Sequence, residues 1–196
     1  MSRRFKHVAK PFTGKDLPTK MKDMTSVVDV IDGYMCWSCE KYAVMAPTDL
    51  ANGQYNPKTW KLNDVQGYPM FRWVKPYKEF SPSWMMSFIE LRRLMQQALV
   101  VAAENANVAK FQFNNSMATL TVSNSTPLGE YRGDAMTEPE RSASDFNNNF
   151  NIKVIAEWIG SVNKKEDQRI WITNVGTTGI GFKTFDGECL FISRDV

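Results

Sequence analysis

Histidine is almost absent from this chain of 196 residues, in which His7 is the only one. Histidine is the most frequent general base in enzymes and a member of most serine-hydrolase triads. The sequence also contains neither a G-x-S-x-G segment nor a phosphate-binding lysine motif. We therefore expect no catalytic residue and no cofactor, and we predict that the protein is not an enzyme.

Cysteine is scarce too, with Cys36, Cys39 and Cys189 as the three residues of this type. An odd number gives no disulfide framework, and reduced thiols are typical of intracellular proteins. Cys36 and Cys39 have the C-x-x-C spacing of zinc and redox sites, but in a strand residues three apart point to opposite faces. No second pair of ligands is present, so we expect no metal site.

Long apolar runs are missing, since none approaches the roughly 20 residues that span a bilayer. The amino terminus is polar and has no apolar signal core. These two absences predict a cytoplasmic protein that has no membrane partner.

Positive charge is modest in total, at +3, but it is unevenly placed. Residues 1–25 hold seven lysines and arginines against two aspartates. A basic arm on a nearly neutral body is a common means of contacting phosphates, which makes Arg3 and Arg4 candidate DNA contacts. A solvated flexible terminus remains the alternative.

An internal repeat is the strongest pattern that is present. A helix with an apolar stripe is followed by strands twice, first as Ser83–Glu104 with Val108–Ser123, then as Ile152–Lys164 with Arg169–Arg194. The two helices start about 69 residues apart. A repeat of this kind determines the architecture before any single residue is interpreted.

Local signals complete the predicted fold. Asp32-Gly33 favours a tight turn in a hairpin over Ser26–Glu40, and Gly176–Gly181 reads as a turn between strands. Gly129–Asn149 is predicted to be a polar surface loop with one strand near Tyr131–Met136. Together these patterns predict an α+β fold with two antiparallel-rich sheet layers and two adjacent helices on one side of the sheets.

The polar faces of the two helices are the main candidate for a functional surface. Their donors, with few acids nearby, are Arg92, Arg93, Gln96, Lys153 and Lys164. On a single helix such residues are usually just solvated. If the repeat places the helices side by side, the faces form one surface that can follow a phosphate backbone without reading sequence.

Several segments resemble the last domain of the bacterial DNA sliding clamp, the ring that makes a polymerase processive. The resemblance covers Tyr68–Val196 and rests on these segments: Tyr68–Pro76, Phe88–Leu99, Ala118–Ser125, Phe150–Ile155 and Leu190–Arg194. It implies a homo-oligomeric ring around double-stranded DNA, with helices lining the hole and sheets outside. It also implies that DNA polymerase and clamp-loader peptides dock in an apolar pocket that includes the carboxy-terminal tail, here Phe191, Ile192 and Val196.

The resemblance divides the chain into a basic arm with a partial β-rich half-domain, 1–76, and a clamp-like domain with two pseudo-repeats, 77–196. The strands of the first part would cap the sheet or pair with a neighbour's edge. The leading hypothesis is a processivity factor that binds duplex DNA without sequence specificity. The alternatives are a single-stranded nucleic-acid-binding protein that uses exposed aromatic rings, and a viral structural or interaction protein.

Overall fold

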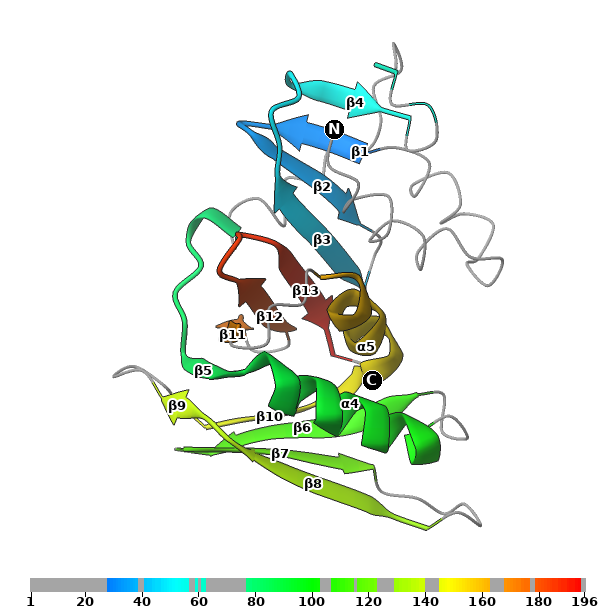
Figure 1. The fold of residues 1–196 in the computed structure, drawn as a ribbon, viewed down its shortest axis with the longest axis vertical. Coiled ribbons are helices and arrows are strands. Elements are labelled where there is room, and N and C mark those ends of the chain that lie inside the picture. The colour runs from blue at the N-terminus through cyan, green and yellow to red at the C-terminus, as the bar shows by residue number, and fades with distance from the viewer. Residues whose placement is uncertain are drawn as a thin grey trace.

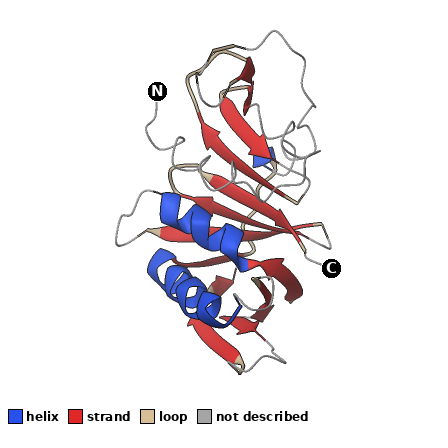
Figure 2. Ribbon diagram, turned by 90° about the vertical axis from the view of Figure 1, so that its right-hand side faces the viewer, coloured by secondary structure: helices blue, strands red, loops and turns tan. Residues whose placement is uncertain are grey.

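The computed structural model describes residues 28–38, 41–56, 59, 61–62, 77–102, 107–114, 116–122, 129–139, 145–162, 168–176 and 179–194. Within these residues the predicted α+β fold is confirmed, with two antiparallel sheets and two long helices (Figure 1). The helices are α4 (Phe88–Ala102) and α5 (Ile152–Ser161). They pack against each other and lie together in front of the strands (Figure 2).

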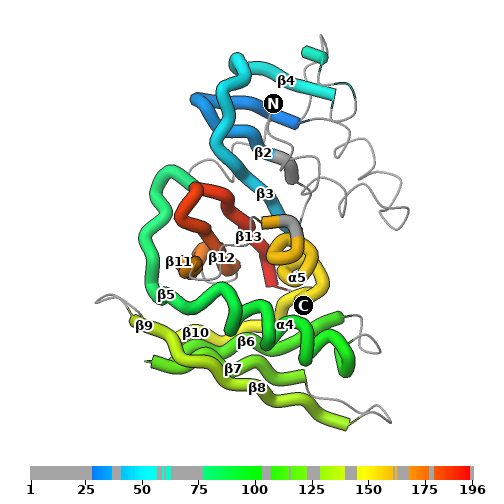
Figure 3. Tube along the Cα trace, viewed as in Figure 1, coloured from blue at the N-terminus to red at the C-terminus, as the bar shows by residue number. Residues whose placement is uncertain are grey.

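The smaller sheet has four strands in the order β10-β6-β7-β8. Its members are β10 (Phe146–Asn151), β6 (Val108–Asn114), β7 (Met117–Val122) and β8 (Tyr131–Met136). The predicted hairpin of β6 and β7 and the predicted strand β8 are confirmed. The larger sheet has the order β4-β1-β2-β3-β13-β12-β11-β5-β9, and in Figure 3 it runs from the amino-terminal strands toward the smaller sheet.

The carboxy-terminal half of the larger sheet comes from the second repeat. It consists of β11 (Arg169–Val175), β12 (Gly179–Thr184) and β13 (Cys189–Ser193). Beyond β11 the sheet continues with two strands from earlier in the chain, β5 (Trp84–Ser87) and β9 (Glu138–Pro139). The strands predicted over Arg169–Arg194 are therefore present, as β11, β12 and β13. The glycine-rich segment between β11 and β12 leads into a strand, as predicted for a turn and not for a phosphate-binding loop.

Each repeat gives its leading strand to the sheet of the other. β5 precedes α4 but pairs with β11, whereas β10 precedes α5 but pairs with β6. The backbone bonds at the helix starts show the same symmetry, because Phe88 N donates to Gln168 O and Ile152 N donates to Asn107 O, both over 2.9 Å. The two repeats thus form one interlocked unit.

The amino-terminal strands extend the larger sheet beyond β13. They are β1 (Val28–Ile31), β2 (Tyr34–Ser38), β3 (Tyr42–Pro47) and β4 (Gly53–Tyr55). The predicted Asp32-Gly33 turn joins β1 to β2, with φ of 52° and 80°, the left-handed region that a type I′ turn needs. β3 pairs with β13, so these strands cap that sheet edge, one of the two roles expected for them.

Two expectations about element boundaries were wrong. The first helix begins at Phe88 and not at Ser83, because Trp84–Ser87 is the strand β5, with Trp84 and Met86 buried. The end of the predicted surface loop, Phe146–Asn149, belongs instead to the strand β10, whose Phe146 and Phe150 are buried in the core. In both cases burial against a distant strand outweighs the local signal.

The core lies between the two sheets and the helices and is rich in aromatic rings. Trp84 stacks on Phe113 at 4.9 Å between centroids, and Phe182 contacts both Phe111 and Trp158. All five side chains are fully buried. Rings in this position cannot stack on nucleic-acid bases, which weakens the single-strand alternative.

Candidate nucleic-acid interface

The two helices pack against each other (Figure 2), and their described exposed residues are here called the helix flank. Both apolar stripes face the core, because Leu91, Leu94 and Ala98 of α4 and Ile155 and Trp158 of α5 are buried. The exposed residues of α4 and α5 are Ile89, Arg93, Gln96, Gln97, Val100, Lys153 and Gly160. The helices predicted to lie side by side therefore do so.

Asparagine side chains and backbone groups fix where the helices meet. Asn151 caps α5, since its Oδ1 accepts a hydrogen bond from Lys153 N over 3.1 Å. Asn107 follows α4 with a φ of 60°, and its N donates to Ala102 O. Because Asn107 O also accepts from Ile152 N, one residue ties the end of α4 to the start of α5.

The residues predicted to contact DNA differ in how exposed they are. Gln96 and Lys153 are exposed, and Arg92 is half-buried on the same helix as Gln96. Lys153 lies near Glu157, whose pKa is raised by burial and partly lowered again by the charge of Lys153. Lys164, Arg3 and Arg4 lie outside the described residues, so their roles stay predictions.

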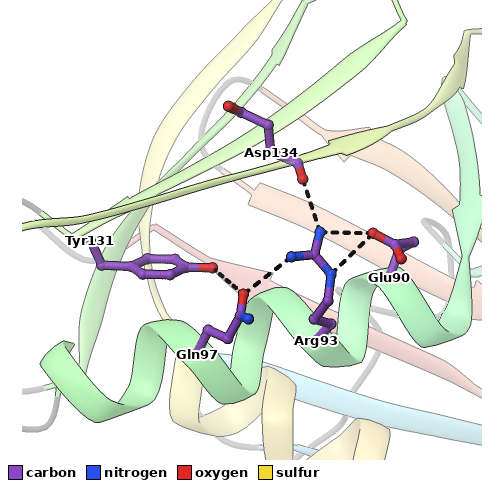
Figure 4. A network of polar contacts seen from close by, with 5 residues as sticks. All are labelled: Glu90, Arg93, Gln97, Tyr131 and Asp134. Carbon is purple, nitrogen blue, oxygen red and sulfur yellow. Dashed lines mark hydrogen bonds and ion pairs between the residues drawn. The ribbon is translucent and has the colours of Figure 1, made fainter.

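Arg93 is engaged within the protein (Figure 4). Its Nε and Nη2 donate to Glu90 Oε2 over 3.2 and 2.8 Å, and its Nη1 donates to Gln97 Oε1 over 3.2 Å. Nη2 also donates to Asp134 O of β8 over 3.1 Å, while Tyr131 OH donates to Gln97 Oε1. The hydrogen bond with Glu90 is the main reason that the pKa of Arg93 is raised. Arg93 is thus turned toward β8.

Sequence reasoning did not foresee these partners. Tyr131 and Asp134 lie about 40 residues from Arg93, and their role depends on how α4 packs on β8. The spacing of Glu90 and Arg93, three apart on a helix, was the available signal that this arginine has a local acidic partner.

The residues predicted for partner binding lie in the interior where the structure describes them. Phe191 and Ile192 belong to β13 and are 0% and 2% exposed. Their expected role as a contact surface is not supported, because β13 pairs on both sides with β12 and β3 and both side chains pack in the core. Val196 lies outside the described residues.

Two of the three cysteines, Cys36 and Cys189, are buried as free thiols. Burial raises the pKa of the Cys36 and Cys189 thiols, which keeps them protonated and unreactive. Cys39, the other member of the C-x-x-C pair, lies outside the described residues. Among the residues that the structure does describe, no group of three or more histidines, cysteines or acids could hold a metal ion. Within the same part of the chain, neither helix has the length and apolar character to cross a bilayer.

Comparison with known proteins shows a similarity of fold. No protein-family model matches the sequence, and no curated protein does. The β subunit of DNA polymerase III from Thermotoga maritima is similar in structure, with a TM-score of 0.74 and 16% identity over 97% of this chain and 62% of that chain. The resemblance inferred from the sequence is therefore confirmed at the level of the fold.

Two further solved structures have a similar fold. A sliding clamp from Pseudomonas aeruginosa has a TM-score of 0.72 and 11% identity, over 98% of this chain and 64% of that one. The clamp from Bartonella birtlesii bound to griselimycin has a TM-score of 0.73 and 8% identity, again over 98% and 64%. This chain spans less than two thirds of the length of these proteins.

Proposed function

We propose that this protein is a sliding-clamp-like processivity factor that binds duplex DNA without reading its sequence and tethers replication proteins. The observation that supports this most is the pair of adjacent helices with exposed polar residues, set in a fold shared with DNA polymerase sliding clamps. The mechanism needs no catalysed reaction, since it depends on holding DNA loosely. The proposed place of action is the cytoplasm.

The proposed DNA contacts are the polar groups of the helix flank. Lys153 and Gln96 are exposed, and Arg92 lies one residue before Arg93 on α4. Glu90 and Glu157 lie beside these cations, so the flank is only weakly positive. A weakly positive surface suits contacts that are partly mediated by water and that let DNA slide. Lys164, Arg3 and Arg4 are proposed to add further contacts.

Salt dependence of DNA binding tests these contacts. We expect Lys153→Ala and Arg92→Ala each to reduce the slope of log K against log salt by about one unit, with no change in sequence preference. Lys110→Ala is the matched control, because Lys110 is exposed on β6 and lies on the opposite face of the sheet from the helices. Equal effects in all three variants would contradict the assignment of the helix flank.

Topology gives a second test. If the protein encircles DNA, it should stay on a closed circular plasmid and be lost when the plasmid is linearised. Preferential binding to single strands, whatever their ends, would favour the single-strand alternative. Binding to neither duplex nor single-stranded DNA would favour the alternative of a viral structural or interaction protein.

The proposed protein partners are a DNA polymerase and clamp-loader-like proteins. Because Phe191 and Ile192 are buried, a docking peptide would have to contact exposed residues near β13 or displace the residues that cover β13. Loss of polymerase processivity on primed DNA without loss of DNA binding, in variants of Val196, would support a role for the tail.

A further inference from the structure

Glu90 and Arg93 form an ion pair on the exposed side of α4, with 2.8 Å between Glu90 Oε2 and Arg93 Nη2. They lie three residues apart, a spacing that puts both side chains on the same side of the helix. The side chains are 41% and 43% exposed, so solvent and ligands can reach both of them. DNA that lies along the helix flank would therefore meet a carboxylate and a guanidinium together.

Four hydrogen bonds occupy the guanidinium group of Arg93 (Figure 4). Nε and Nη2 donate to Glu90 Oε2, Nη1 donates to Gln97 Oε1, and Nη2 also donates to Asp134 O. A guanidinium has five N–H groups, so these bonds to described residues leave one of them, on Nη1. A phosphate that binds through the usual two parallel hydrogen bonds has to displace one of these partners.

Glu90 is the strongest of the partners that hold Arg93. Gln97 is neutral, and Asp134 takes part through its backbone carbonyl, whereas Glu90 supplies a negative charge and accepts two of the four bonds. Hydrogen bonds between charged groups are roughly twice as strong as those between neutral groups. Tyr131 OH donates to Gln97 Oε1 over 3.1 Å, which fixes that neutral partner as well. Removing the carboxylate of Glu90 is therefore the change that frees the guanidinium most.

We infer that Glu90 withholds Arg93 from DNA and so lowers the affinity of the helix flank for phosphates. Glu90 is a positioning residue, since it acts through Arg93 and not by contact with DNA. The inference rests on the proposed function and deepens it, because a protein that holds DNA loosely needs few permanent phosphate contacts. The sequence carries an arginine on the flank, and the fold keeps that arginine engaged.

The salt dependence of binding to a fluorescent DNA duplex tests the inference. Glu90→Ala should raise the association constant about fivefold to tenfold at about 0.1 M salt and steepen the slope of log K against log salt by about one unit, because one further phosphate contact releases one further counterion. Arg93→Ala alone should leave the slope unchanged, since the natural protein does not offer this arginine to DNA. A slope that falls in Arg93→Ala as it does in Lys153→Ala would overturn the inference.

The matched control makes the same substitution without the arginine. In the double variant Glu90→Ala with Arg93→Ala, one negative charge is still removed, but there is no guanidinium to release. The slope of the double variant should therefore equal that of Arg93→Ala alone. A slope that steepens in the double variant as well, or one that does not steepen in Glu90→Ala, would show that the effect does not pass through Arg93.

A measurement without DNA separates this inference from the proposed function. Exchange of the Arg93 Nε–H with water, followed by nuclear magnetic resonance, should be slower in the natural protein than in Glu90→Ala, because Glu90 accepts this hydrogen bond. Equal exchange rates would overturn the inference even if DNA binds. If exchange is slower as expected but neither the natural protein nor any variant binds DNA, the proposed function is contradicted, and the DNA step of the inference with it.

Discussion

At the scale of single residues, Asp29 is a carboxylic acid placed where a charge is costly. It is 6% exposed in β1, and burial raises its pKa, an effect partly opposed by the hydrogen bond that Gln54 Nε2 donates to its Oδ1 over 2.8 Å. The folded state therefore holds this proton more tightly than the unfolded chain does. The contribution of Asp29 to stability is greatest in acid and is lost as the pH rises through the raised pKa.

Asp29→Asn should accordingly increase the free energy of unfolding at pH 7, because asparagine keeps an acceptor for Gln54 and carries no charge. The difference from the natural protein should shrink as the pH falls toward about 4, the ordinary pKa of an aspartate. Urea unfolding of both proteins at several pH values measures this. A difference that stays constant from pH 4 to pH 7 would show that ionisation of Asp29 is not its cause.

At the scale of elements, the packing of α4 on β8 depends on a glycine. A Cβ at Gly133 would lie 2.2 Å from Tyr131 OH and 2.8 Å from Leu94 Cδ2. Tyr131 would have to leave Gln97, and the buried Leu94 would have to shift. Close approach of helix and strand is therefore possible at this position because no side chain intervenes.

Gly133→Ala should lower the free energy of unfolding by about 1–3 kcal/mol through overpacking. Gly160→Ala is the matched control, since a Cβ there meets nothing within 4 Å and the residue is exposed in α5. Alanine at that helical position should stabilise the protein by about 0.5–1 kcal/mol. Thermal or urea unfolding distinguishes the two, and a shift of the same sign in both would contradict the packing argument.

The elements also show what the sequence could and could not predict. The Asp32-Gly33 hairpin and the apolar stripes of α4 and α5 were predicted correctly because their signals are local. The strands β5 and β10 were missed, since Ser81-Pro82-Ser83 resembles a helix start and Asn147–Asn149 has poor β-propensity. Both become strands through partners more than 30 residues away.

The candidate site was predictable to a lesser degree. The adjacency of the helices followed from the repeat, but the orientation of Arg93 depends on β8 and was not foreseeable. Phe191 and Ile192 were assigned to a docking pocket by the family resemblance and are interior, because β3 pairs with β13 from a part of the chain more than 140 residues earlier.

At the scale of the whole molecule, the proposed function requires more than one copy. The solved clamps are longer, since this chain spans 62% and 64% of two of them. We expect light scattering to show a mass above that of the 22.4 kDa monomer, at least when circular DNA is added. A monomer at every concentration, with and without DNA, would count against an encircling role.

The exchange of β5 and β10 between the repeats has a consequence for how this molecule can come apart. Neither repeat forms a complete sheet alone, so a peptide bond broken between Pro139 and Asp145 would still leave β5 paired with β11 and β10 paired with β6 across the break. A gene split at that point would yield two polypeptides that must associate in order to fold. The two repeats are held together by strand pairing across both sheets and not only by the backbone that connects them.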